Sequence, residues 1–337
     1  MVNSIFSLEL LSMTKVAVLL YSDPDITVSR SGIVSVKERD SIVEKKLSNL
    51  DLPPVIKKTI TRLSKPLSDQ IKQWVLDHLS ILNFGTSIPP NEYFFKDNGT
   101  IDRIKTAKNY IENENNNVYL RFLMASVYWF EEEARTLWNE MPRAIRSHLF
   151  SIRPYPSCPR WLFAVMHWIV YIRCGDADWR KHFFSPSWYC EDRVVLQGNL
   201  LQQLTPEEQL GVFKGLMKDS TPTQTKSFCL SKMSTEQFEE VIKEEPLNVF
   251  IALFNWPLHL QFQEMTDRFF LLLSKKDFLC FLFNVILEKM ELNSMDSDYV
   301  YLLNELRNKC PDNFKKYMDN SGVSNILKNT LKHVNNK

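Results

Sequence analysis

Residues 118–141 limit the folds open to this chain more than any other stretch. Their first half, VYLRFLMASVYW, is apolar on nearly every side, which is typical of a buried helix. Three glutamates follow, and apolar residues then recur at helical spacing, namely Phe130, Ala134, Leu137, Trp138 and Met141. The glutamates fall in the first turn of this second helix, where the helix dipole favours acids, and Pro142 ends it. One such hairpin cannot bury both of its faces, so we expect helical neighbours on each side.

The composition favours an all-α protein. Only eight of the 337 residues are glycine, whereas 44% are hydrophobic and 12% are aromatic. A chain poor in glycine and rich in bulky side chains favours helices over turn-rich β or α/β folds. We therefore expect irregular helical hairpins stacked as a solenoid-like array, with a helical N-terminal module before them.

Breaks in the helical pattern divide the chain. We expect the N-terminal module at 1–115 and the hairpin array at 116–337, with a sub-boundary near 151–160, where three prolines cluster. Apolar spacing and helix-stop residues predict individual helices near 6–21, 55–63, 68–84, 100–111 and 161–173.

A weak repeat occupies the C-terminal part of the array. Leu204-Thr205, Met233-Ser234 and Leu273-Ser274 each place a hydroxyl after an apolar residue, with an acid or amide three residues beyond the hydroxyl. The first two match the capping box, in which the hydroxyl and the later side chain each bond the other's backbone N–H. The three hydroxyl residues, Thr205, Ser234 and Ser274, lie 29 and 40 residues apart. These spacings are around the period of helical repeats but are not constant.

Charge and cysteine content point to an intracellular protein. The net charge of +1 argues against a generally basic nucleic-acid binder, and six dispersed cysteines do not form a disulfide framework. Glu9 and Lys15 interrupt the apolar start, so we expect no signal peptide. No segment is long and apolar enough to span a bilayer, and we expect no membrane partner. The expected location is the cytoplasm, with the nucleus also open.

The sequence lacks the signatures of common enzymes. It contains no G-x-G-x-x-G, G-x-x-x-x-G-K-[ST], G-x-S-x-G or H-E-x-x-H motif, so we expect no enzyme and no cofactor. Structural zinc usually takes ligands in close pairs, but the ligand-type residues here are seven to nine residues apart: Cys158, His167, Cys174, His182 and Cys190. We expect these residues to pack in the core and to bind no metal.

The central hairpin resembles a degenerate ankyrin-type helix pair. Leu123-Met124-Ala125-Ser126 stands where that family has its first-helix alanine segment, and residues 132–137, EEARTL, look like its second helix. More broadly, the chain resembles a lineage-expanded family of helical arthropod proteins. These resemblances imply a helical fold and no activity.

Two N-terminal segments resemble the halves of a SOCS box. Residues 7–16, SLELLSMTKV, are similar to its elongin-binding helix, S/T-L-x-x-x-C/S-x-x-x-aliphatic, and place Leu8, Ser12 and Val16 on one helical face. Residues 50–57, LDLPPVIK, resemble its cullin-binding segment through Leu52, Pro53 and Pro54. The resemblance implies a ubiquitin-ligase adaptor whose partners are elongin and cullin components. In the alternative interpretation, these leucines pack the first helix against the rest of the chain.

Residues 143–193 combine arginine with aromatic side chains. The stretch has four more basic than acidic residues, and tryptophans and tyrosines are interleaved with them. Protein hot spots and single-stranded nucleic-acid platforms both use this combination. The candidate partner-binding residues are Arg153, Arg160, Trp161, Trp168, Arg173, Trp179 and Trp188. The alternative is that the tryptophans fill the core while the arginines lie in solvent.

These patterns favour a non-enzymatic scaffold that presents a helical surface to another protein. The first alternative is the ubiquitin-ligase adaptor, and the second is RNA binding through residues 143–193. Nucleic acid is the less favoured partner because the charge excess is small.

Overall fold

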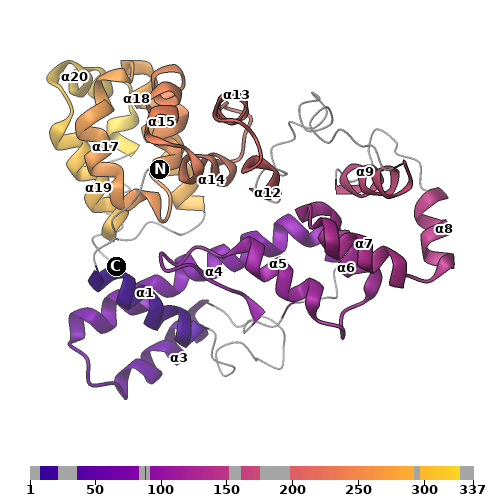
Figure 1. Ribbon diagram of the computed structural model, residues 1–337. Helices are drawn as coiled ribbons and strands as arrows, with labels where there is room; N and C mark the ends of the chain where they lie inside the picture. Colours follow the sequence, from indigo (N-terminus) through magenta and orange to yellow (C-terminus); the bar gives the residue numbers. More distant parts are fainter. Residues whose placement is uncertain are drawn as a thin grey trace. The chain divides into compact units, whose positions relative to one another are not determined.

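The protein is all-α, as the sequence predicts. The computed structural model describes residues 8–21, 36–82, 88, 92–151, 161–174, 198–291 and 297–326 (Figure 1). Within these ranges the only extended pairing is a single bridge between Phe95 and Ile101. Contacts divide the chain into two compact units, Ile5–Leu204 and Thr205–Lys337, here called the N-terminal and C-terminal units. The solenoid-like arrangement stays a prediction.

The N-terminal unit holds the helices up to residue 204. In chain order they are α1 (Leu8–Tyr21), α3 (Val36–Ser48), α4 (Pro54–Leu82), α5 (Arg103–Glu112), α6 (Val118–Tyr128), α7 (Glu131–Glu140), α8 (Arg143–Ser151), α9 (Trp161–Cys174) and α12 (Gly198–Leu201). Helices α1 and α3 pack on α4, while α6 contacts α4, α5, α7 and α9. The boundary that the sequence predicted at 115–116 falls inside this unit, between two helices that pack together.

Helix α4 is a single helix where the sequence predicted two. Pro66 lies inside it and, having no backbone N–H, cannot donate the usual hydrogen bond to the preceding turn. The apolar residues on both sides of this proline, Leu63 and Leu67, are 5% and 0% exposed. Burial of this face against the neighbouring helices offsets the lost bond, so the helix continues to Leu82.

The central hairpin forms as predicted. Helix α6 ends at Tyr128, and Trp129 caps it in the left-handed region with φ 59°. Helix α7 begins with the three glutamates in its first turn. Its predicted stripe is buried at Ala134, Leu137 and Trp138, which expose 0%, 2% and 6% of their surface, while Phe130 is half-buried.

A fully buried polar cluster joins α4 to α6. The ring of His78 stacks on Trp74, with centroids 3.8 Å apart, and its Nε2 lies 2.8 Å from the hydroxyl of Tyr128. The carbonyl of Trp74, next to Nδ1, can only accept, so Nδ1 carries the proton and Nε2 accepts from Tyr128. Beside this cluster, Arg103 of α5 pairs with Asp77 of α4.

Burial controls the protonation of this cluster. It lowers the pKa of His78 to about 3, and the nearby positive charge of Arg103 adds to the effect. Burial also raises the pKa of the Tyr128 hydroxyl above its usual range. Both groups are therefore neutral at physiological pH, and the cluster holds α4 and α6 together without a buried charge on the imidazole.

The C-terminal unit is built around one short apolar helix. Its elements are α13 (Pro206–Leu216), α14 (Thr223–Lys232), α15 (Thr235–Glu244), α16 (Pro246–Leu253), η2 (Leu258–Gln261), α17 (Phe262–Phe269), η3 (Phe270–Leu272), α18 (Lys275–Glu291), α19 (Ser297–Lys309) and α20 (Asp312–Asn320). Helix α16 is buried from Asn248 to Leu253 and contacts α14, α15 and α18. A helix that is apolar all round needs such neighbours on every side. Phe250 of α16 and Phe254, which caps its C-terminal end, meet Phe262 and Phe281, with ring centroids 4.9–6.3 Å apart.

A buried polar network also reaches α16. Lys226 of α14 is 3% exposed, and its Nζ donates to Oδ1 of Asn248 over 2.6 Å. The amide of Asn248 donates in turn to Asp219 over 2.9 Å. The asparagine thus links a buried amine to a carboxylate, and the network fixes the pairing of α14 with α16.

The predicted capping boxes are confirmed at both sites. Thr205 with Glu208 and Ser234 with Gln237 bond each other's backbone reciprocally at the starts of α13 and α15. Ser274 and Asp277 make the same pair of bonds before α18. None of the described helices is long and apolar enough to cross a membrane.

Candidate protein-binding face

Among the described residues of the N-terminal unit, the exposed side of α1 carries two of the most exposed large apolar side chains. Helix α1 packs along α4, and Thr14 and Ala17 are buried, at 2% and 4% exposed. Away from these residues, the side chains that face solvent follow one another at helical spacing. We call them the outer face of α1: Leu8, Ser12, Lys15 and Leu19.

Two leucines dominate this outer face. Leu8 is 83% exposed and Leu19 is 66% exposed, among the highest values for large apolar side chains in the described chain. They stand 11 residues apart, which is about 16 Å along a helix. Between them, the hydroxyl of Ser12 donates to the carbonyl of Leu8 over 2.7 Å, so it is satisfied within the helix.

The exposure of Leu8 disagrees with the interpretation in which the N-terminal leucines pack the first helix against the rest of the chain. Packing of Leu8 against the chain would require a buried side chain, and Leu8 is mostly in solvent. Val16, the third residue of the predicted elongin-binding face, is half-buried. The helix is instead held by its opposite side, because Thr14 and Ala17 are small enough to allow a close approach to α4.

The second half of the SOCS-like pattern lies at the junction of α3 and α4. Leu50 is 41% exposed, Leu52 is half-buried, and Pro53 is exposed. Pro54 is the first residue of α4, a position that suits its fixed φ. The non-helical part therefore ends at Pro53. Val55, the second residue of α4, exposes 76% of its surface.

The arginine- and aromatic-rich candidates are only partly described. Trp168 of α9 is 0% exposed, and its ring lies tilted against Trp129 at 4.7 Å and meets Tyr171 edge-on at 5.4 Å. It packs α9 against the central hairpin and cannot stack on a base in this arrangement. Trp161 and Arg173 lie in α9, but their side chains are outside the described set, as are residues Arg153, Arg160, Trp179 and Trp188.

The described residues offer little catalytic chemistry. The thiol of Cys229 is buried, and this burial raises its pKa to about 12, so the reactive thiolate is scarce at neutral pH. No group of three His, Cys, Asp or Glu side chains gathers to hold a metal ion within the described part of the chain. Cys158, His182 and Cys190 lie outside that part.

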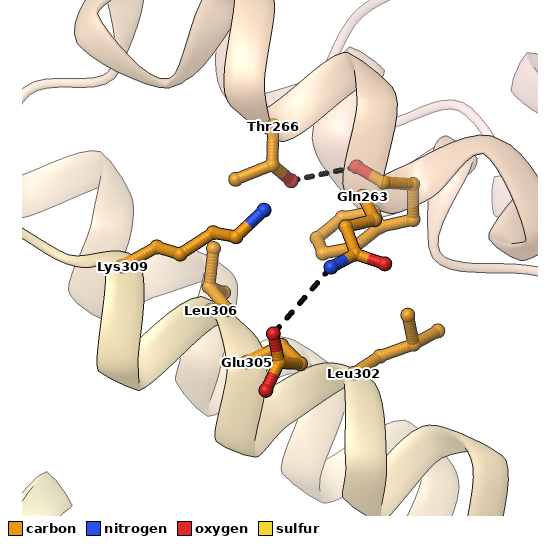
Figure 2. A pocket seen from close by; sticks show the side chains of 7 residues that line it. Gln263, Thr266, Leu302, Glu305, Leu306 and Lys309 are labelled. Carbon is orange, nitrogen blue, oxygen red and sulfur yellow. Dashed lines mark hydrogen bonds between the residues drawn. The ribbon is translucent and has the colours of Figure 1, made fainter.

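One shallow depression lies between α17 and α19 (Figure 2). Gln263 reaches across it and donates to Glu305 over 3.4 Å. Lys309, which also lines it, pairs with Asp267. Its empty volume is about 190 Å³, open solvent included. Small-molecule sites usually enclose roughly 300 Å³ or more, so this depression does not suit a substrate.

Sequence patterns missed parts of the exposed surface of the N-terminal unit. Lys15 lies seven residues after Leu8, and the same spacing could have placed it on the outer face of α1. Val55 gave no such signal, because an apolar residue after two prolines is equally compatible with a buried first turn.

Comparison with known proteins finds no match to this chain. Neither protein-family models, nor curated proteins, nor solved structures give a match to this chain.

Proposed function

We propose that this protein is a non-enzymatic scaffold that binds a protein partner through the outer face of α1. The observation that carries the proposal is the exposure of Leu8 and Leu19 on one stripe of a helix whose other side is anchored. Single exposed leucines are common and need no explanation. Two on the same stripe form the pattern by which a helix enters a partner's apolar groove.

Several features support this mode of binding. Ser12 and Lys15 separate the two leucines and keep the stripe narrow, so each leucine would act as a discrete anchor. The anchored side of α1 keeps the helix formed before binding, which lowers the entropic cost of association.

Capture of partners from the native cell tests the proposal. Tagged full-length chain should retain a partner that Leu8→Ala/Leu19→Ala loses. Each leucine removed from a desolvated pocket should weaken binding by about 2 kcal/mol, roughly thirtyfold. Val55→Ala is the matched control, because Val55 is a similarly exposed apolar residue of the same unit. Equal capture by all three chains would refute a role for this face.

The ubiquitin-ligase adaptor is the second candidate, and the exposure of Leu8 favours it. The SOCS-box resemblance implies that Leu8 fills a pocket on elongin, and the side chain is free to do so. Purified chain should then bind purified elongin heterodimer, and Leu8→Ala should abolish binding while Leu19→Ala keeps it. A scaffold with another partner requires both leucines and shows no affinity for elongin.

A further inference from the structure

Three helices begin with the same local arrangement. Before α13, α15 and α18, a buried apolar residue precedes a capping hydroxyl, and these apolar residues are Leu204, Met233 and Leu273, at 5%, 0% and 3% exposed. In each case the side chain three residues after the hydroxyl closes a reciprocal pair of hydrogen bonds. The three starts can therefore be compared position by position.

The start of α18 differs at the outward positions. The two residues before the buried apolar residue are polar at α13 and α15: Gln202-Gln203 and Ser231-Lys232. At α18 they are Leu271 and Leu272, which expose 84% and 40% of their surface. Leu271 is as exposed as any large apolar side chain in the described chain, so the third start places two leucines in water where the others place polar groups.

The charge at the second helical position is also reversed at this start, while Asp277 keeps an acid in the first turn. The second helical position carries Glu207 in α13 and Glu236 in α15, where the positive end of the helix dipole favours an acid. Helix α18 has Lys275 and Lys276 in its first two positions, both exposed, and neither forms an ion pair among the described residues. Because cations there oppose the dipole, helix stability does not account for them.

The leucine pair sits on a rigid support. The ring of Phe270 lies 5.5 Å from that of Phe278 and 5.3 Å from that of Phe314, which fixes η3 to α18 and α20. The backbone N–H of Leu273 donates to the carbonyl of Phe270 over 3.0 Å. The turn therefore holds Leu271 and Leu272 outward instead of letting them fold back.

We propose that this turn, Leu271 to Lys276, is a peripheral contact for a membrane surface rich in anionic lipid. Two leucines suit the boundary between headgroups and acyl chains, and two adjacent lysines suit the negative headgroups. Such a contact needs no membrane-spanning helix. It goes beyond the proposed function and differs from the sequence-based expectation of no membrane partner.

Vesicle co-sedimentation of the full-length chain tests the proposal. Wild-type chain should bind vesicles of phosphatidylcholine mixed with phosphatidylserine, and bind pure phosphatidylcholine at least about tenfold more weakly, because each lysine near an anionic surface adds to the attraction. Leu271→Gln/Leu272→Gln copies the glutamines at the start of α13. It should lower the partition coefficient on the anionic vesicles by about tenfold or more, since the anchoring apolar area is lost.

A second variant separates lipid binding from folding. Lys275→Thr/Lys276→Glu copies the start of α15, so its melting temperature should be unchanged or higher, while its binding to anionic vesicles falls. Leu260→Gln is the control, because Leu260 is a 43% exposed leucine elsewhere in the same unit and should keep full binding. No binding by wild-type chain, or equal binding by the leucine or lysine variant, would overturn the proposal. Self-association that the leucine variant abolishes, without lipid binding, would assign the turn to a protein contact instead.

Discussion

Trp138→Ala is expected to lower the free energy of unfolding by about 3–5 kcal/mol, the usual loss when a large aromatic side chain is removed from a core. The indole is 6% exposed. Its ring lies 5.3 Å from that of Phe122 on α6 and meets Phe150 of α8 edge-on at 5.2 Å. Alanine would leave a cavity where three helices meet, and neighbouring aromatic rings cannot easily fill it.

Urea unfolding followed by circular dichroism measures this loss. Thr136→Ala is the matched control, because Thr136 is exposed on the same helix and its change should stay within about 0.5 kcal/mol. A loss below about 1 kcal/mol for Trp138→Ala would mean that the indole does not pack between α6 and α8.

His78 is expected to make the fold sensitive to acid. Its pKa is about 3 in the folded chain, lowered chiefly by burial, against an ordinary value of 6.5. Above pH 6.5 the imidazole is neutral in both the folded and the unfolded chain, and its contribution to stability is fully present. As pH falls below 6.5, the unfolded chain takes up a proton that the folded chain refuses, so stability is lost progressively down to about pH 3.

The size of this effect follows from proton linkage. Between pH 7 and pH 5, the histidine should remove about 2 kcal/mol from the free energy of unfolding. His78→Gln, which keeps a polar side chain of similar reach, should flatten the pH dependence by that amount. Parallel pH profiles for wild-type and His78→Gln chain would contradict a buried, neutral His78.

Local sequence signals predicted the elements that depend on local chemistry. The hairpin of α6 and α7 was predictable because its apolar spacing, its acidic first turn and Pro142 all agree. The capping boxes at Thr205 and Ser234 were predictable for the same reason, since the bonds join residues only three apart.

Features that depend on tertiary packing were not predictable. The continuity of α4 through Pro66 comes from the burial of Leu63 and Leu67, and no local signal overrides a proline inside a helix. The sequence predicted this helix from residue 100, yet α5 begins at Arg103 and Asp102 caps it, because Thr100 bonds Asn98 in the preceding turn. Both residues are good caps, and only the path of the turn selects between them.

The candidate sites show the same limit. Helical spacing placed Leu8 and Ser12 on one face of α1, but it could not tell whether that face is buried. The small residues Thr14 and Ala17 decide this, because they let the opposite side approach α4. Similarly, Leu271 and Leu272 look like part of an apolar run in the sequence. Only the rings that hold Phe270 show which residues of that run point outward.

Binding of a partner through α1 requires that the chain itself leaves the outer face of α1 uncovered. Thermal unfolding of the isolated Leu8→Ala/Leu19→Ala chain tests this requirement most directly, since alanine keeps the helix and removes only the exposed side chains. The melting temperature should stay within about 2 °C of wild type, as for other surface substitutions. A fall of more than about 4 °C would show that these leucines pack within the chain, and it would contradict the proposed binding face.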